Sequence, residues 1–265
     1  MAINLDDIKK LHEELLEGPS GGFSNNFLQI PFATDEKPNT TVRLLPGKDD
    51  ETPFYVKTMI HRLQGAGKDG NDANFHCRKV HGDECPLCDL YFGTWKWVND
   101  NIPTAEQKEH PHAKYANYIR AKDRYYINVL DRETDEVKIL SVGIKLFTKI
   151  VGAFTDEDFG DITDLQTGHD FKIIKTKNGN WPDYSNSSAR PKETPTSPTK
   201  KRIAEVMDSL HDLAALVKTY EYDEIKKVAM MNNPVATAER EAPELLTDET
   251  EGDEKFKDRM ENLDA

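Results

Sequence analysis

The stretch FHCRKVHGDECPLC, residues 75–88, contains every cysteine of the 265-residue chain: Cys77, Cys85 and Cys88. The last two form a CxxC motif, whose short loop lets two thiolates reach one metal ion. Three cysteines clustered within a dozen residues do not suit a secreted disulfide framework, and in a reducing compartment such spacing indicates metal binding or catalysis. The stretch therefore predicts a zinc site that needs a fourth ligand.

Candidates for this fourth ligand are three nearby histidines, His61, His76 and His81, with His110 and His112 further along the chain. His76 adjoins Cys77, so in extended chain the two side chains point apart. His81 lies midway between Cys77 and Cys85, and could reach the ion only through two loops of three residues each. His61 ends the strand-like run PFYVKTMIH, and the glycine-rich loop GAGKDGND returns the chain to Cys77. This ribbon-like arrangement favours His61 and leaves His81 open.

Four protein ligands would leave no open position for water or substrate, so the ion is expected to hold structure and not to catalyse a reaction. The sequence also has no phosphate-binding glycine loop, no HExxH motif and no nucleophile elbow. We therefore expect a protein that is not an enzyme.

Charge is unevenly distributed along the chain. The formal net charge is −13, and from Glu239 onward eleven acidic residues face four basic ones, whereas the middle of the chain is nearly neutral. Residues 5–17, LDDIKKLHEELLE, have helical apolar spacing, and residues 233–265 have the composition of a disordered acidic tail. No long apolar run follows the N-terminus, so we expect a soluble intracellular protein.

The central region predicts an α+β fold. Residues 27–63 contain short apolar and alternating runs typical of strands, and RYYINVL (124–130) and EVKILS (136–141) flank a polar turn, which predicts a hairpin. HDFKIIKTK at 169–177 alternates again, and the Pro- and Ser-rich residues 182–199 predict a loop. Residues 89–100 predict a helix or a helix that runs into a strand, and helices are expected at 145–154, 203–218 and 222–231.

Aromatic and basic residues interleave in two segments. KYANYIRAKDRYYINV, from Lys114, contains four tyrosines among four basic residues. The segment from Phe171 to Arg202 contains Trp181 and Tyr184 with eight basic and two acidic residues. Cations that follow phosphates and rings that stack on bases are the usual elements of single-strand binding, although tyrosines on strands also commonly serve as packing residues.

Taken in order, these motifs resemble the single-stranded DNA-binding proteins of T-even-like bacteriophages. The resemblance rests on TVRLLPGKDD (41–50), the span from His61 to GDECPLC, RYYINVL, GNWPDY (179–184) and the acidic tail, and covers residues 22–230. The order of the motifs, with the unusual His…Cys…CxxC spacing, is fairly specific, whereas each motif alone is weak.

The resemblance implies an OB-fold-type β-barrel core with a zinc-binding subdomain, flanking helices and a disordered acidic tail. The domains would be a helical arm (1–21) with possible self-association, a DNA-binding core (22–232) and a tail for protein partners (233–265). It implies the zinc ligands His61, Cys77, Cys85 and Cys88. It implies DNA contacts by Tyr125, Tyr126, Trp181 and Tyr184, by Tyr115 or Tyr118, and by a basic surface that includes Arg120, Lys122, Arg124 and Lys177.

The implied function is sequence-independent coating and protection of single strands, melting of secondary structure, and recruitment of phage replication, recombination and repair proteins, in the cytoplasm of an infected bacterium. One departure is the N-terminal arm, because family members begin with a basic arm that makes binding cooperative, whereas Lys9 and Lys10 are the only basic residues of the first helix here. The alternative is a zinc-ribbon module that binds proteins of a phage replication or transcription complex without contacting DNA.

Overall fold

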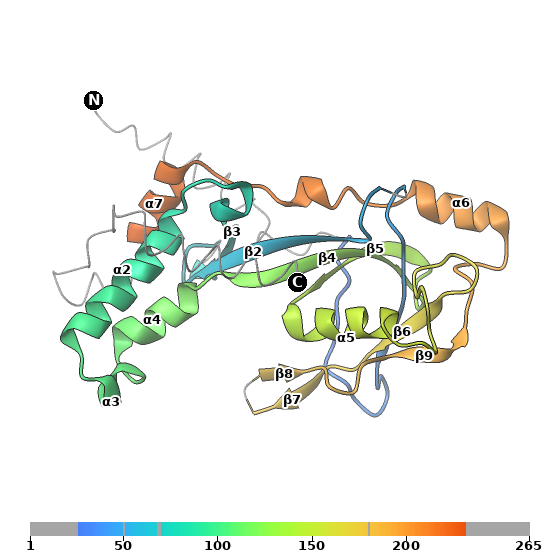
Figure 1. Ribbon diagram of the computed structural model, residues 1–265, viewed down its shortest axis with the longest axis horizontal. Coiled ribbons are helices and arrows are strands. Elements are labelled where there is room, and N and C mark those ends of the chain that lie inside the picture. Colours follow the sequence, from blue (N-terminus) through green and yellow to red (C-terminus); the bar gives the residue numbers. More distant parts are fainter. Residues whose placement is uncertain (1–25, 50, 68–69, 180, 232–265) are drawn as a thin grey trace. The chain divides into compact units, whose positions relative to one another are not determined.

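The computed structural model describes residues 26–49, 51–67, 70–179 and 181–231, which form two compact units. The described part of unit 1 comprises residues 59–67, 70–122 and 218–231, and that of unit 2 comprises residues 26–49, 51–58, 123–179 and 181–217. The predicted N-terminal helix and the predicted acidic tail lie outside the described residues. Figure 1 labels the helices and strands of both units.

Unit 1 combines a short antiparallel pair of strands with helices. The second half of β2 (Tyr55–Leu63) pairs with β3 (Ala73–His76), with His61 opposite Phe75. Helices α2 and α4 pack against each other, and α7 packs against α2 (Figure 1). The remaining elements of the unit are η2 (Arg78–His81), α2 (Pro86–Asn101), α3 (Thr104–Gln107), α4 (Pro111–Ile119) and α7 (Tyr222–Met231).

Local sequence explains where helix α2 begins and ends. Cys85 is extended and precedes Pro86, whose fixed φ and missing N–H suit the first helical position. The helix stops before Ile102, which is also extended because Pro103 follows it. Cys85 therefore lies just before the helix and Cys88 lies in its first turn, so the CxxC motif spans the N-terminus of α2.

Unit 2 is built on an antiparallel sheet with the strand order β4-β1-β6-β9, in which β5 pairs with the other edge of β4. The expected hairpin is β4 (Lys122–Asp131) and β5 (Glu136–Val142), with Tyr126 opposite Ser141. The sheet and the buried face of α5 enclose an apolar core around Leu140, Phe147 and Phe171. The other elements are β1 (Thr40–Leu44), α5 (Ile144–Phe154), β6 (His169–Ile173), β7 (Thr176–Asn178), β8 (Trp181–Asp183), β9 (Ser188–Glu193), α6 (Lys200–Asp208) and η3 (Ala214–Leu216).

The α+β class is confirmed, but the strands do not close into a barrel over the described residues. The segment 182–199, predicted as a loop, instead contributes part of β8 and all of β9. Pairing explains the difference, because Ala189 lies opposite the fully buried Phe171 of β6. The Pro and Ser residues in this segment lower its strand propensity. The strand forms nevertheless, because proline is tolerated at the edge of a sheet and the pairing with β6 stabilises β9.

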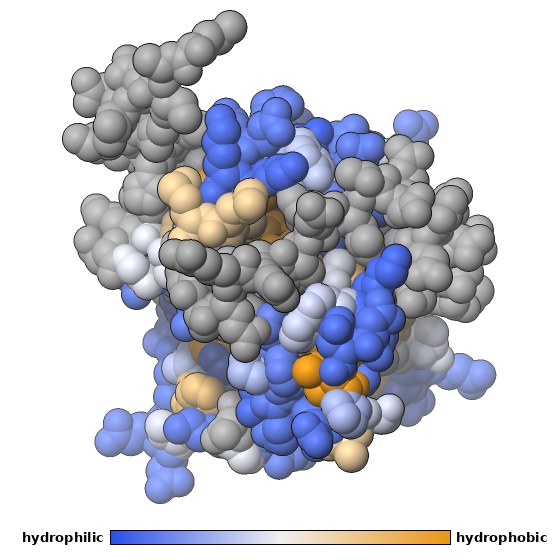
Figure 2. Space-filling view, turned by 90° about the vertical axis from the view of Figure 1, so that its left-hand side faces the viewer, coloured by the Kyte–Doolittle hydropathy of each residue, from blue (hydrophilic) through white to orange (hydrophobic). Residues whose placement is uncertain are grey.

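The described residues visible in Figure 2 are mostly hydrophilic, and the apolar ones among them form small separate patches. Among the residues that the structure describes, no helix is both long and apolar enough to cross a membrane.

Candidate metal centre and nucleic-acid contacts

The four predicted metal ligands come together in unit 1. His61 lies on β2, Cys77 follows β3, and Cys85 and Cys88 flank the start of α2. One donor atom from each residue lies within 4.8 Å of the other three, and all four residues are buried. The sequence therefore brings one imidazole and three thiols to a single point.

The distances between these donors fit a single tetrahedral ion. The Sγ atoms of Cys77 and Cys88 are 3.5 Å apart, and His61 Nε2 lies 3.5 Å from Sγ of both Cys85 and Cys88. Metal bonds of about 2.3 Å to sulfur and about 2.0 Å to nitrogen would give tetrahedral edges of roughly 3.8 Å (S–S) and 3.5 Å (S–N). These three distances are thus close to those of a tetrahedral metal site.

A second contact fixes the imidazole in the form that binds metal. Nδ1 of His61 lies 2.7 Å from the carbonyl oxygen of Ile119, at the end of α4. Because a carbonyl only accepts, Nδ1 must carry the proton, which leaves the Nε2 lone pair facing the thiols. Hydrogen bonds from Cys77 and Cys88 lower the pKa of Cys85 well below its usual value, which favours the thiolate that a metal requires.

The other two histidines lie outside the cluster. His81 is an exposed residue of η2. His76 is buried, but its Nδ1 lies 3.0 Å from the Lys218 carbonyl oxygen. The alternative ligand His81 is therefore not part of the group of donors that the structure brings together.

Two of the predicted DNA contacts, Tyr115 and Tyr118, lie on α4 of unit 1. Tyr115 is buried in the core of the unit. Tyr118 is partly exposed, and its hydroxyl donates a hydrogen bond to Asp72. Asp72 also forms an ion pair of 2.8 Å with Arg62, whose guanidinium lies 5.7 Å from the centre of the Tyr118 ring. The sequence did not predict a helix at 111–119, and the tyrosines of this segment were interpreted as possible stacking residues.

Tyr125 and Tyr126 lie on β4 in unit 2 and are both buried. The ring of Tyr125 stacks on Phe147 of α5, with a centroid distance of 3.7 Å. Tyr126 points to the opposite face of the strand, where Phe27 packs edge-on against it at 6.1 Å. Burial raises the pKa of Tyr126 to about 12. Adjacent residues on a strand face opposite sides, and here both sides are covered.

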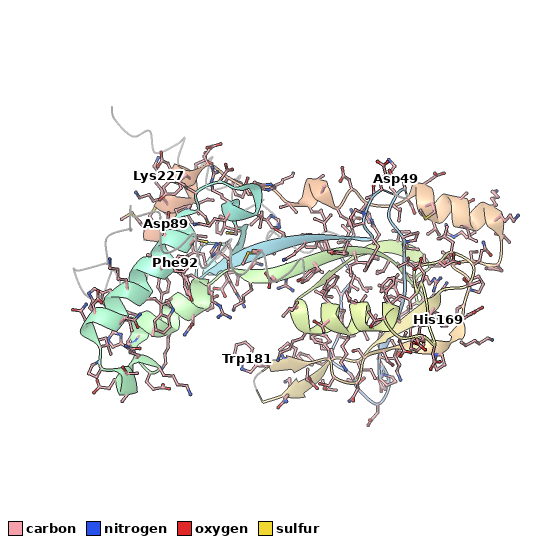
Figure 3. All side chains as sticks on the ribbon, in the orientation of Figure 1. Asp49, Asp89, Phe92, His169, Trp181 and Lys227 are labelled. Carbon is pink, nitrogen blue, oxygen red and sulfur yellow. The ribbon has the colours of Figure 1, made fainter. Side chains whose placement is uncertain are left out.

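Trp181 is the most exposed of the predicted stacking residues. It lies on the β7–β8 hairpin of unit 2, and 71% of its surface is accessible (Figure 3). Lys177 on the same hairpin is also exposed, whereas Tyr184 is half-buried and packs against the core of unit 2. The predicted cations Arg120 and Lys122 are exposed, and Arg124 is partly buried.

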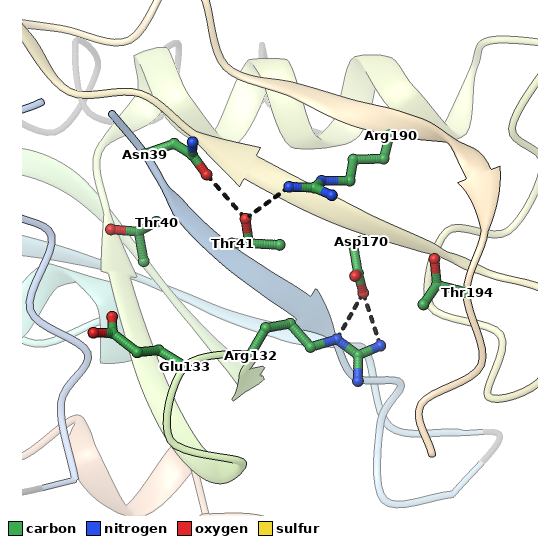
Figure 4. A pocket seen from close by; sticks show the side chains of 8 residues that line it. All are labelled: Asn39, Thr40, Thr41, Arg132, Glu133, Asp170, Arg190 and Thr194. Carbon is green, nitrogen blue, oxygen red and sulfur yellow. Dashed lines mark hydrogen bonds and ion pairs between the residues drawn. The ribbon is translucent and has the colours of Figure 1, made fainter. Parts of the chain in front are cut away.

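A polar hollow between β1, β6 and β9 in unit 2 contains two further arginines (Figure 4). Arg132 forms an ion pair with Asp170 at 2.8 Å and donates to the carbonyl oxygens of Pro195 and Thr196. Arg190 donates to the hydroxyl of Thr41. Because these bonds stay within unit 2, we interpret the hollow as a structural tie between the sheet and the segment after β9.

The buried cluster of one histidine and three cysteines forms a possible metal-binding site in a protein of the α+β class. Residues 36–235 match the family described as gp32 DNA binding protein like, and the chain belongs to this family. The match includes all four clustered ligands and the Trp181 hairpin, and it confirms the family resemblance drawn from the sequence. A comparison with curated proteins gave no match.

Proposed function

We propose that this protein binds single-stranded DNA without sequence preference. The observation that carries the proposal is the Trp181 hairpin, in a chain of a DNA-binding family. A tryptophan that exposes 71% of its surface contributes little to a core, but it offers a flat ring to a base. Stacking of this kind is worth about 1–3 kcal/mol per base and accepts any base.

Basic residues of the two units would supply the electrostatic part of binding. In this proposal the exposed Arg120, Lys122 and Lys177, together with Arg124, neutralise phosphates. Contacts of DNA with Tyr115, Tyr118, Tyr125, Tyr126 and Tyr184 stay predictions. The burial of Tyr115, Tyr125 and Tyr126 also supports a packing role, since a covered ring must be uncovered before it can stack.

The metal proposed for the cluster is one structural Zn²⁺, held by His61, Cys77, Cys85 and Cys88. Zinc favours sulfur and imidazole donors at tetrahedral positions, which is the donor set found here. Bound zinc would supply folding energy to unit 1. The cysteines follow β3 and open α2, and His61 bonds the end of α4, so the cluster links these three elements.

The proposed biological role is that of a phage protein in the infected bacterial cytoplasm. It would coat and protect exposed strands, melt secondary structure and recruit replication, recombination and repair proteins. Recruitment is assigned to the acidic tail at 233–265 and self-association to residues 1–21, both outside the described residues. An OB-fold relationship of the core is part of the same proposal.

The test is a titration of the full chain with labelled oligo(dT) and with duplex of the same length, at two salt concentrations. We expect a clear preference for the single strand and a log–log salt slope of about −0.7 per phosphate contact. Equal affinity for the two forms would contradict the proposal. Binding to neither would favour the alternative, a zinc-ribbon module that contacts only proteins.

A further inference from the structure

We propose a second nucleotide-contact site in unit 2, formed by Phe32, Lys175 and Lys177, on the other face of the β7–β8 hairpin from Trp181. The site rests on the proposed single-strand binding and extends it. Phe32 and Lys175 were not among the residues singled out in the sequence.

The first observation is an exposed aromatic ring. Phe32 has 40% of its surface accessible, and it lies in the irregular segment before β1. This segment is held against the hairpin region, because the Ala33 N–H donates to the Lys175 carbonyl at 2.8 Å and Lys175 Nζ donates to the Ile30 carbonyl at 3.0 Å. The ring is therefore fixed in place while remaining open to solvent.

The second observation is that two ammonium groups lie over this ring. Lys175 Nζ is 4.5 Å and Lys177 Nζ is 5.4 Å from the centre of Phe32. Contacts at these distances are cation–π interactions, which are worth only about 0.5–1 kcal/mol at an exposed site. Because these contacts are weak, a base could displace an ammonium group from the accessible ring, and the lysine charges would then be available to its phosphates.

The register of the hairpin separates this group from Trp181. Asn178 lies opposite Trp181, and Lys177 lies opposite Pro182. Residues directly opposite each other share a face and successive residues alternate, so Lys177 and Trp181 project from opposite faces. Phe32, which contacts Lys177, therefore belongs to the lysine face. A strand that passes around the hairpin could stack one base on Trp181 and another on Phe32.

The experiment measures oligo(dT) affinity of full-length variants by anisotropy of a labelled oligonucleotide, over a ladder of lengths. Phe32→Ala is expected to weaken binding of the longer oligonucleotides about fivefold or more, the loss of one stacked base. Lys177→Gln is expected to reduce the salt slope by about 0.7. The control is Val151→Ala, which removes a 37% exposed apolar side chain of the same unit and should leave affinity unchanged.

Phe32→Trp, together with thermal melting, distinguishes a DNA-contact role of Phe32 from a purely structural one. The tryptophan keeps a ring beside the lysines, so we expect wild-type affinity and additional fluorescence quenching by oligo(dT). If Phe32→Ala binds like wild type while Trp181→Ala is weakened, the second site is wrong and the proposed function stands. If Phe32→Ala lowers the melting temperature and the introduced indole is not quenched, the ring is a packing residue and the site is also wrong. If wild type does not bind single strands, the proposed function fails first.

Discussion

Replacing Trp181 with alanine should weaken DNA binding without unfolding the protein. The expected loss of stability follows from the exposed fraction of the Trp181 side chain. A fully buried tryptophan hides about 200 Å². With 71% of Trp181 exposed, only about 60 Å² is covered, so the loss is at most about 1.5 kcal/mol at 25 cal/mol per Å². The loss of one stacked base costs about 1–3 kcal/mol, or roughly 5- to 150-fold in Kd.

The assay needs two independent measurements on each variant. Anisotropy of labelled oligo(dT) gives the affinity, and urea unfolding gives the stability. Ile144→Ala, which shortens another exposed apolar side chain of unit 2, is the matched control and should bind normally. Trp181→Phe keeps a smaller ring and should recover part of the affinity. An unchanged Kd for Trp181→Ala would refute the stacking argument. A fall in stability well beyond about 1.5 kcal/mol would show that Trp181 contributes more to packing than its exposed fraction indicates.

Three further outcomes are expected. His61→Ala should lose one equivalent of zinc in elemental analysis and loosen unit 1, whereas His81→Ala should retain the metal; retention by both would exclude His61 as a ligand. Burial is the largest single influence on the pKa of Asp72 and acts to raise it, but the hydrogen bonds from Tyr118 and Gly65 and the ion pair with Arg62 together outweigh burial and lower the pKa. A group whose pKa is lowered in the folded state stabilises the protein above its unfolded pKa of about 3.9, and this stabilisation is lost as the pH falls. Between pH 7 and 3, the free energy of unfolding of Asp72→Asn should therefore decrease less than that of wild type. An identical decrease would argue against this role of Asp72. Tyr125→Ala should cost about 3–5 kcal/mol in urea unfolding because the ring is buried, whereas Tyr125→Phe keeps the ring and should cost less; equal effects of the two would contradict the packing of this ring.

The metal cluster was predictable from the sequence because its ligands are few and chemically distinctive. All three cysteines occur in one short stretch, and the strand-like run before His61 already favoured that histidine. His61 joins the cluster through the pairing of β2 with β3, which places it beside the chain that leads to Cys77. The hairpin at 124–141 and helix α5 were predicted for a similar reason, since each depends on a local pattern.

The remaining features depend on contacts distant in sequence. No local pattern shows that Ala189 pairs with Phe171, so β9 was predicted as a loop. Nor does the alternation of Tyr125 and Tyr126 show that Phe147 covers one ring and Phe27 the other. Phe32 lies in an apolar run predicted as a strand, and only its approach to Lys175 and Lys177 gives it a possible role.

The gathering of every cysteine of the chain in one buried site has a practical consequence for labelling. A thiol reagent finds no other target, and bound metal would shield all three sulfurs. The number of reactive thiols would then rise from none in the folded, loaded protein to three after chelation and unfolding. For the same reason, a single cysteine introduced on the surface would accept a dye selectively in the metal-loaded protein, so the native chain needs no cysteine replacement before fluorescence work.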